Sequence, residues 1–376
     1  MRIIYFANTR MPNEKAHGTQ LAKMCEAFVE AGVDLTLVVP RRGIQNPRSI
    51  RDFYGLRKDI KIHYLPIPHF GSSRNLFNLE AFCFGIASFV VALGERIRNS
   101  STIIYTIDLD QFSYFLLPLA GLPVFFECHG SKVQSLFFIF FIKRVKKIIA
   151  VSGGVARSLF ENYKIDTRKI LVASNAIDQN FSKKILPKDV ARDKFGIAKD
   201  VPVALYLGKF YDWKGLDVLV RGAVLLPGIQ FILVGDTIER LLEVTGESKI
   251  SANVLVIGEV PHFDVPAMLS CADVLLLTGT AKNRYSYFET SPMKVFEYAA
   301  TRIPVISART PAVEEICGDG AYYYEPDSVD SFVEAVSRSF GNREEAEVRA
   351  DSLYAKIGTY SWNERTSRIL QAINTK

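Results

Sequence analysis

The chain has 376 residues, of which 48% are hydrophobic and 23% are charged. This usage excludes a largely disordered chain and predicts about two domains. Its five cysteines are scattered without a Cys-x-x-Cys pair, which excludes a disulfide framework and a zinc ribbon and favours a reducing, cytoplasmic compartment. Residues 1–180 hold 23 Lys+Arg and 14 Asp+Glu, so the first half is basic. No basic segment precedes an apolar one after Met1, and we expect no signal peptide.

The first half alternates strand-like and helix-like segments. An apolar run at 2–7 precedes a helical pattern at 21–29, which ends at Gly32, and a second apolar run follows at 35–39. This order predicts a βαβ unit with parallel strands. Further strands are expected at 102–106, 123–126, 147–151 and 170–173, with a helix near 155–162. We expect residues 1–178 to form one domain.

The second half repeats this organisation after a polar stretch at 179–200, which we interpret as a linker. Strands are expected at 203–207, 231–234, 253–257, 274–277, 304–307 and 321–324. Helical patterns separate them, so a second parallel sheet is predicted within residues 179–358. The fold class is therefore α/β, with two doubly wound Rossmann-like domains facing a cleft. Ligands of such sheets bind beyond the carboxyl ends of the strands.

Three features at predicted strand ends of the second domain point to an anionic ligand. Lys209 follows the first strand directly, and Lys214 lies five residues later on the same loop. Ser291-Pro292-Met293-Lys294 opens a helix, with serine expected at the N-cap and proline at the first helical position. A helix start offers free N–H groups and the positive end of the dipole. Ordinary capping with solvated lysines would explain any one feature, but three together favour a phosphate site.

Two glutamates, Glu289 and Glu297, flank this helix start, and carboxylates suit ribose or sugar hydroxyls. The run from Glu289 through Glu297 to Ile306 resembles the signature of the GT4 family of retaining glycosyltransferases, glycosyltransferase group 1, which have the GT-B fold. Further segments resemble that family. They are Gly208-Lys209 with Lys214-Gly215 (diphosphate clamp), Asn175-Ala176-Ile177-Asp178 (domain junction), Glu127-Cys128-His129 (strand end) and Tyr360-Ser361-Trp362 (start of the final segment).

The resemblance implies a role for each matching residue. Lys209 and Lys214 would hold the diphosphate of a nucleotide sugar, helped by the N–H groups of Met293 and Lys294 and by Ser291. Glu297 would bind the ribose, Glu289 the donor sugar, and Val260 with its loop would line the base pocket. His129 would reach the sugar from the first domain, and Gly18 would let the first loop approach the diphosphate. A final helix at 359–376 would cross back to the first domain.

The sequence departs from the commoner family pattern in four places. Only Gly18 is present where many members have two glycines, and Lys209 replaces an arginine. Ala176 replaces the glycine of the junction motif, and Thr290-Ser291-Pro292 replaces a run that contains glycine. The last difference bears on the position of Glu289.

Three other features have competing interpretations. Asp108-Leu109-Asp110 spells an Asp-x-Asp motif, which binds Mg²⁺ or Mn²⁺ in another class of glycosyltransferases, but we interpret it as a turn. Asp236 is expected to cap a helix. The phenylalanine-rich stretches at 75–91 and 136–142, the latter followed by Lys143 and Arg144, are either buried helices or surfaces that contact an anionic membrane. The basic first half favours the membrane.

The resulting hypothesis is a metal-independent retaining transferase without a cofactor, of hexosyltransferase type. It would move a sugar from a nucleoside diphosphate sugar to a hydroxyl acceptor in polysaccharide, glycolipid or lipid-linked glycan synthesis. The nucleotide predicted for the donor is UDP. A cytoplasmic enzyme at the inner face of the membrane is expected, with no nucleic-acid partner. The alternatives are a sugar-nucleotide epimerase or hydrolase of the same fold and a non-catalytic nucleotide-sugar-binding protein. A dinucleotide-dependent oxidoreductase is disfavoured because no Gly-x-Gly-x-x-Gly follows the first strand.

Overall fold

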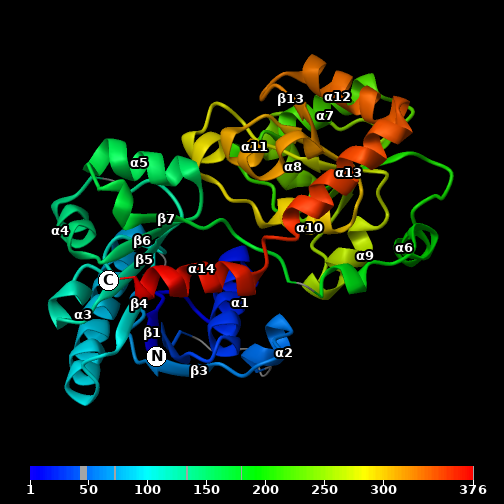
Figure 1. Cartoon of the computed structure of the whole chain (residues 1–376). Coiled ribbons are helices and arrows are strands. Elements are labelled where there is room, and N and C mark those ends of the chain that lie inside the picture. The colour runs from blue at the N-terminus through cyan, green and yellow to red at the C-terminus, as the bar shows by residue number, and fades with distance from the viewer. Residues whose placement is uncertain (43–48, 72, 133, 179, 376) are drawn as a thin grey trace. The chain divides into compact units, whose positions relative to one another are not determined.

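The computed structural model describes residues 1–42, 49–71, 73–132, 134–178 and 180–375 (Figure 1). The chain forms two compact units. Unit 1 comprises Met1–Asn175 and Trp362–Lys376, and unit 2 comprises Ala176–Ser361. The expected ranges were 1–178 and 179–358, and residue 179 lies outside the described residues. The two connecting segments pair with each other through a parallel bridge between Ile177 and Ser361, and both of these residues belong to unit 2.

Unit 1 is built on a seven-stranded parallel sheet of order β3-β2-β1-β4-β5-β6-β7. Its strands are β1 (Arg2–Phe6), β2 (Asp34–Pro40), β3 (Lys61–Leu65), β4 (Ile103–Ile107), β5 (Val124–Cys128), β6 (Lys147–Ala150) and β7 (Ile170–Val172). The sequence reading missed β3. This strand lies at the edge of the sheet and alternates Lys61 and His63 with apolar residues, so it lacks the continuous apolar run of a central parallel strand.

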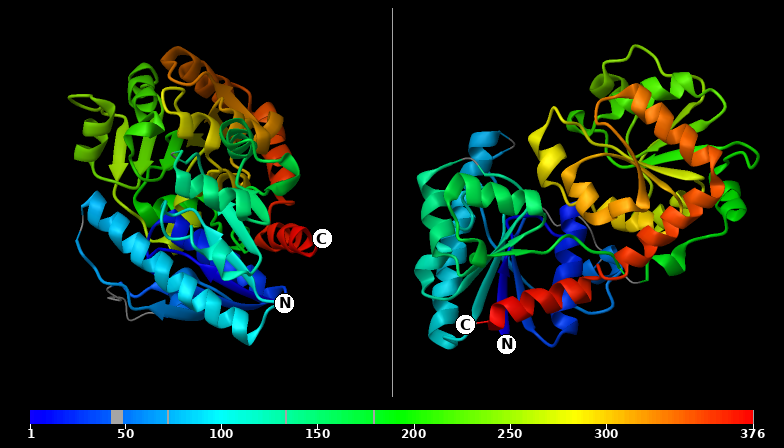
Figure 2. Two further views of the ribbon diagram at one scale, coloured as in Figure 1. Left: turned by 90° about the vertical axis from the view of Figure 1, so that its left-hand side faces the viewer. Right: turned by 45° about the horizontal axis from the view of Figure 1, so that its top comes forward.

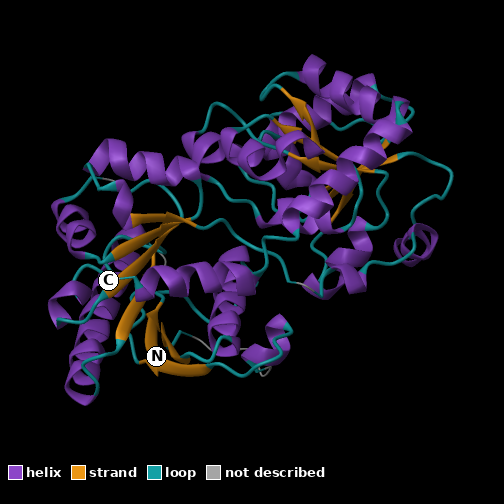
Figure 3. Ribbon diagram, viewed as in Figure 1, coloured by secondary structure: helices purple, strands orange, loops and turns teal. Residues whose placement is uncertain are grey.

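Helices enclose this sheet on both faces (Figures 2 and 3). One face packs against α3 (Arg74–Arg98), α4 (Leu136–Arg144) and α5 (Gly153–Tyr163), whose buried residues share a core with Ile4 and Phe6 of β1. On the other face α1 (Ala16–Glu30) contacts α14 (Trp362–Asn374). The short elements are α2 (Ile50–Tyr54), η1 (Leu117–Ala120) and η2 (Thr167–Lys169). The predicted doubly wound sheet is confirmed for unit 1.

Unit 2 contains a six-stranded parallel sheet of order β10-β9-β8-β11-β12-β13. Its strands are β8 (Val203–Leu207), β9 (Gln230–Val234), β10 (Val254–Ile257), β11 (Val274–Leu277), β12 (Val305–Ala308) and β13 (Ala321–Tyr324). One face packs against α6 (Lys188–Phe195), α9 (Val265–Leu269), α10 (Met293–Ala300), α11 (Pro311–Cys317) and α13 (Arg343–Ile357). The other packs against α7 (Leu216–Leu225), α8 (Ile238–Thr245) and α12 (Val329–Gly341). The second predicted doubly wound sheet is therefore also confirmed.

The polar stretch interpreted as a linker contains structure, which corrects the prediction. After the turn η3 (Ser182–Lys184), helix α6 packs Ala191 into the core of unit 2. The fully buried Arg192 donates to the carbonyl oxygens of Cys271 and Lys199 and pairs with Asp273 at 2.8 Å. A single arginine thus anchors a polar helix that shows little apolar periodicity in the sequence.

Candidate functional site

The loops after β8 and β9 approach each other closely because both begin with glycine. Gly208 N–H donates to the carbonyl oxygen of Val234 at 2.7 Å. A Cβ on Gly235 would lie 2.6 Å from the backbone carbonyl of Gly208, and both glycines have positive φ. The carboxyl end of the sheet is therefore open to a ligand at backbone level.

A recess lies beside these strand ends within unit 2. It is lined by residues of β8 and β11, of the loops that follow these strands, and of the starts of α10 and α11, namely Tyr206, Trp213, Lys214, Leu277, Thr278, Ser286, Thr290, Pro292, Lys294, Thr310 and Val313. Two of them, Lys214 and Lys294, are cationic. The Lys214 ammonium lies 4.2 Å from the ring centre of Trp213, and that of Lys294 lies 4.7 Å from the ring centre of Tyr206. The recess thus joins two ammonium groups with aromatic faces that favour cations.

Neither ammonium group has a carboxylate at ion-pair distance among the described residues, although Glu297 lies near Lys294. Burial lowers the pKa of Lys214 to about 8. Burial, helped by the nearby Lys214 charge and opposed by Glu297, lowers the pKa of Lys294 well below its ordinary value. Within the described part of the chain, neither lysine forms an ion pair. Two cations held this way bind an anion more favourably than two solvated lysines would.

The backbone at the start of α10 adds to this positive potential. The N–H groups of Met293 and Lys294 stand in the first turn, where no carbonyl lies one turn earlier in the helix. Pro292, with extended ψ of 119°, is the N-cap and has no side-chain capping hydrogen bond. The prediction of Ser291 as N-cap and Pro292 as first helical residue is wrong by one position. Because the backbone of Pro292 is extended, the helix begins at Met293, and Ser291 is buried ahead of that start.

Lys209, expected to act beside Lys214, has other partners in the structure. Its ammonium forms an ion pair with Glu259 and lies 3.8 Å from an Asp236 oxygen. Asp236 does not cap α8, contrary to expectation, because Thr237 is the N-cap and accepts from Arg240 N–H. The structure therefore brings Lys214 and Lys294 together and holds Lys209 against acidic side chains that follow β9 and β10.

The two predicted glutamates differ in their surroundings. Glu289 is buried at the end of the π-turn η6 (Tyr285–Glu289), where Arg284 Nε donates to its Oε1 at 3.2 Å. Glu297 is half-buried on α10. Burial raises its pKa, and the charges of His262 and Lys294 partly offset that effect. Val260 packs against the core beyond β10, and its neighbour Glu259 is the partner of Lys209.

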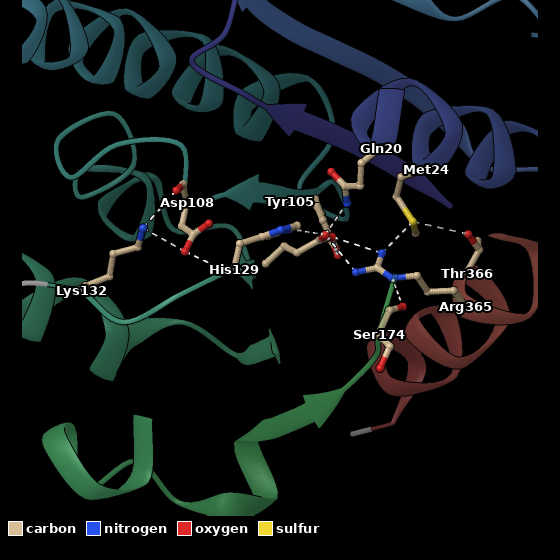
Figure 4. Close-up of polar contacts among 10 residues, drawn as sticks. Gln20, Met24, Tyr105, Asp108, His129, Lys132, Ser174, Arg365 and Thr366 are labelled. Atoms are coloured by element: carbon tan, nitrogen blue, oxygen red, sulfur yellow. Dashed lines mark hydrogen bonds and ion pairs between the residues drawn. The ribbon is translucent and has the colours of Figure 1, made fainter. Parts of the chain in front are cut away.

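Unit 1 contains a second charged centre, around Glu127 at the end of β5 (Figure 4). His129 Nε2 lies 2.8 Å from Glu127 Oε1, and Arg365 of α14 pairs with the same oxygen at 2.9 Å. Tyr105 and Gln20 also donate to this carboxylate, at 2.7 and 2.6 Å. Burial alone would raise the pKa of Glu127, but Arg365 and the hydrogen bonds outweigh it and hold the pKa well below its usual range.

This arrangement assigns the proton of the His129 ring. A carboxylate only accepts, so Nε2 carries the hydrogen that binds Glu127, and Nδ1 is left for another partner. The backbone N–H of His129 donates to Asp108 Oδ2 at 2.8 Å, which fixes the residue from the other side.

Comparisons with known proteins match both units. The family model described as "Glycosyltransferase Family 4" matches residues 17–181, and the model "Glycosyl transferases group 1" matches residues 187–352. The chain belongs to the GT4 glycosyltransferases. A D-inositol 3-phosphate glycosyltransferase from Mycobacterium tuberculosis is 23% identical over 244 residues, which cover 61% of this chain and 48% of the relative. The chain thus spans about half the length of the curated relatives it matches.

Solved structures identify the fold as GT-B. A glycosyltransferase from Rickettsia africae superposes with a TM-score of 0.76 at 16% identity, covering 100% of this chain and 99% of the other. Sucrose-phosphate synthase from Thermosynechococcus elongatus gives 0.75 at 14% identity, with 99% and 98% covered. Anabaena Alr3699/HepE, solved with UDP and glucose, gives 0.72 at 16% identity, with 100% of both chains covered.

In this member of the GT4 family Gly18 has a packing role. It lies in the first turn of α1, not in the preceding loop as expected. A Cβ there would lie 2.6 Å from both Asn13 Oδ1 and Tyr54 Oη. Tyr54 Oη in turn donates to the carbonyl oxygen of Asn13 at 2.8 Å. The missing side chain therefore lets residues 9–15 fold back on α1.

The Asp-x-Asp motif forms a turn, as predicted. Asp110 accepts from the backbone N–H groups of Phe112 and Ser113, both at 2.7 Å. Asp108 pairs with Lys132 at 2.9 Å. Within the described residues, no group of three or more His, Cys, Asp or Glu side chains could hold a metal ion.

Sequence reasoning missed several members of both centres. Trp213 and Tyr206 of the recess show no separate signal, because aromatic residues beside strands are common in cores. Arg365 lies 238 residues from Glu127 along the chain, so only the fold reveals the pair. The motif Glu127-Cys128-His129 was found because it follows a predicted strand and resembles a motif of the family.

Proposed function

We propose that this protein transfers a sugar from a nucleoside diphosphate sugar to a hydroxyl acceptor. The single observation that carries the proposal is the pairing of Lys214 and Lys294 in one recess at the start of α10. A departing diphosphate gains negative charge as the glycosidic bond breaks through an oxocarbenium-like state. Cations and N–H groups already aimed at that charge lower the barrier without reorganisation.

The remaining roles follow from the family and the local chemistry. Glu297 is proposed to hold the ribose hydroxyls, Glu289 to contact the donor sugar, and Val260 to line the base pocket. Retention of configuration, with a leaving phosphate oxygen taking the proton of the acceptor, is the family expectation that we adopt. The two lysines supply the charge stabilisation that a divalent ion supplies in other transferases. The part of His129 in transfer stays a prediction.

The identity of the donor and acceptor is also proposed. Uridine diphosphate is favoured because Anabaena Alr3699/HepE, of the same fold, was solved with UDP and glucose. A glycan or lipid-linked hydroxyl is proposed as acceptor, and a hexose as the transferred sugar. A cytoplasmic place of action, favoured by the scattered cysteines, stays a prediction.

Thermal-shift measurements with UDP-, GDP-, ADP- and dTDP-sugars test the donor, since a specific ligand raises the melting temperature by mass action. We expect one nucleotide class to stabilise the protein. The variant Lys214→Ala/Lys294→Ala should lose about a hundredfold or more in affinity, from the loss of two charge-assisted contacts. The matched control Lys183→Ala/Lys249→Ala removes two exposed lysines of unit 2 and should bind normally. Equal affinity in both variants would contradict the proposed site.

Turnover assays separate the alternatives. A transferase consumes donor rapidly only with an acceptor hydroxyl present. Fast consumption of donor alone would favour an epimerase or hydrolase of the same fold. Tight binding with no transfer to any glycan or lipid acceptor would favour a binding protein.

A further inference from the structure

Helix α3 carries large apolar residues on its exposed side as well as on its buried side. Between Leu79 and Leu93 its exposed residues are all large and apolar, namely Leu79, Phe82, Ile86, Val90 and Leu93. Its buried side also packs apolar residues, Ala81, Phe84 and Ala92, beside Glu80, Gly85, Ser88 and Glu95. A helix at a water-exposed surface instead turns polar residues outward. The outward face of α3 is therefore built for contact with something other than water.

These exposed residues form one straight stripe. Successive members from Leu79 to Ile97 are three or four residues apart, and five steps cover 18 residues. That spacing equals one helical turn of about 3.6 residues per step, so the stripe runs parallel to the axis for about 27 Å. Val90 and Ile97 are 61% and 87% exposed.

The stripe continues onto neighbouring elements of unit 1. The Phe82 ring stacks on Phe115 at 5.8 Å, and Phe137 of α4 meets the same ring edge-on at 5.4 Å. Phe137 and Leu136 are 52% and 84% exposed. We name this continuous surface, from Leu79–Ile97 of α3 to Leu136 and Phe137 of α4, the α3–α4 face.

The charges around the α3–α4 face are positive. The exposed charged residues of α3 are Arg74, Arg96 and Arg98, at its two ends. Its two glutamates are buried, Glu80 against Arg42 at 3.1 Å and Glu95 against Arg2 at 3.1 Å. Helix α4 ends in the exposed Lys143 and Arg144, and no acidic residue occurs between Glu127 and Glu161.

We propose that the α3–α4 face docks on an anionic lipid bilayer, with α3 lying in the plane of the interface. Apolar side chains flanked by arginine and lysine match the acyl and headgroup layers of such a surface. By length and composition α3 could also cross a membrane, but Phe84 and Ala92 pack it onto the core of unit 1. A second copy is the less favourable occupant, because it would set basic helix ends against one another.

Vesicle co-sedimentation tests this proposal, and its outcome does not depend on sugar transfer. We expect binding to vesicles of phosphatidylglycerol and phosphatidylcholine, and at least tenfold weaker binding to phosphatidylcholine alone. The variant Ile86→Gln/Val90→Gln should bind the anionic vesicles about tenfold less. The control Val224→Gln/Leu225→Gln makes the same kind of change at exposed positions of α7 in unit 2 and should bind fully.

Two results would overturn it. One is the absence of binding to anionic vesicles, or equal binding by the Ile86→Gln/Val90→Gln variant. The other is a dimer in sedimentation velocity that this variant dissociates, which would assign the face to a second copy.

A separate observation concerns the Glu127 centre and rests on the proposed function. Arg365 is held in the core of unit 1, where its Nε donates to the carbonyl oxygen of Ser174 at 3.0 Å (Figure 4). Its side chain is 3% exposed, and that of Glu127 is fully buried. We infer that Arg365 is a positioning residue, which keeps Glu127 ionised and thereby holds His129 in the tautomer with Nδ1 free.

The charged groups around the imidazole set the expected effect of removing Arg365. They are Glu127, Arg365, Asp108 with its partner Lys132, and His17 of α1. Burial, with Lys15 and His129 nearby, lowers the pKa of His17 to about 4, so His17 is neutral near pH 7. Without Arg365, the buried Glu127 carboxylate loses its cationic partner, and the acceptor that fixes the His129 tautomer loses its support.

Nitrogen chemical shifts of the His129 ring, assigned with His129→Gln, test this inference. Arg365→Lys keeps the charge and should keep the wild-type tautomer. Glu127→Gln/Arg365→Met removes both charges, keeps similar volumes and should give a mixture of tautomers with a lower kcat and an unchanged donor KM. A wild-type His129 spectrum in the Glu127→Gln/Arg365→Met variant would overturn the inference. Loss of all sugar transfer in Arg365→Lys, with a normal His129 spectrum, would refute only the proposed function.

Discussion

The two charged centres of this chain are built in opposite ways. In unit 1 the buried Glu127 carboxylate is matched by Arg365 and accepts from His129, Tyr105 and Gln20. In unit 2 the recess holds Lys214 and Lys294, neither of which forms an ion pair among the described residues, although Glu297 lies near Lys294. A compensated centre holds side chains in place, whereas an uncompensated one is prepared for a ligand of opposite charge. The Glu127 centre is therefore interpreted as a positioning network, and the lysine recess as a binding site.

The largest expected effect comes from breaking the compensated centre. Arg365→Met leaves Glu127 buried without its partner, which should lower the free energy of unfolding by about 3–5 kcal/mol. Lys294→Met removes an uncompensated cation and should leave stability unchanged or slightly raised. Urea unfolding followed by circular dichroism measures both. Equal losses in the two variants would show that the centres do not differ as described.

The difference also predicts a pH dependence of donor binding. Lys214 has a pKa of about 8 in the empty recess, and a bound diphosphate favours its charged form. Above that value a proton must be taken up on binding, so affinity for a UDP-sugar should fall as pH rises from 8 to 9, by at most tenfold per unit for one proton. Titration calorimetry between pH 7 and 9 measures this. Lys214→Arg, charged throughout, should give a flatter profile, and a steep fall in that variant would exclude Lys214 as the cause.

Much of this architecture was readable in the sequence, for a physical reason. Central parallel strands such as β8 and β11 are buried on both faces and appear as uninterrupted apolar runs, and both were predicted with their observed limits. The edge strand β3 and the polar helix α6 lack such runs, because pairing at an edge and the Arg192 contacts hold them instead.

The sites were less predictable than the fold. The loop of Lys209 and Lys214 and the helix start at Lys294 could be found because strand ends and capping patterns are local. The ion pairs of Lys209 and the Arg365–Glu127 pair join distant segments. Only the arrangement of the strands brings those segments together.

A smaller effect is expected where the recess meets the backbone. A Cβ on Gly208 would clash with the Lys294 ammonium nitrogen, and Gly208 has φ of +147°. Gly208→Ala should therefore displace Lys294 and weaken donor binding by about tenfold, the scale of one lost charge-assisted contact. Gly228→Ala is a matched control, since its Cβ would meet nothing within 4 Å. Calorimetry on both variants decides, and an unchanged affinity in Gly208→Ala would argue against Lys294 as an anion ligand.

The smallest effect tests whether Lys209 joins the anion site. The family resemblance assigns it to the diphosphate, whereas the structure pairs it with Glu259 and Asp236. Both statements hold if the ligand draws Lys209 out of an exposed ion pair, which costs up to about 1 kcal/mol. Glu259→Gln then frees the ammonium and should raise donor affinity about two- to fivefold at low salt, with the gain shrinking as salt screens the pair. A loss of affinity would instead make Glu259 a direct contact of the nucleotide, and no change would leave Lys209 outside the uncompensated centre.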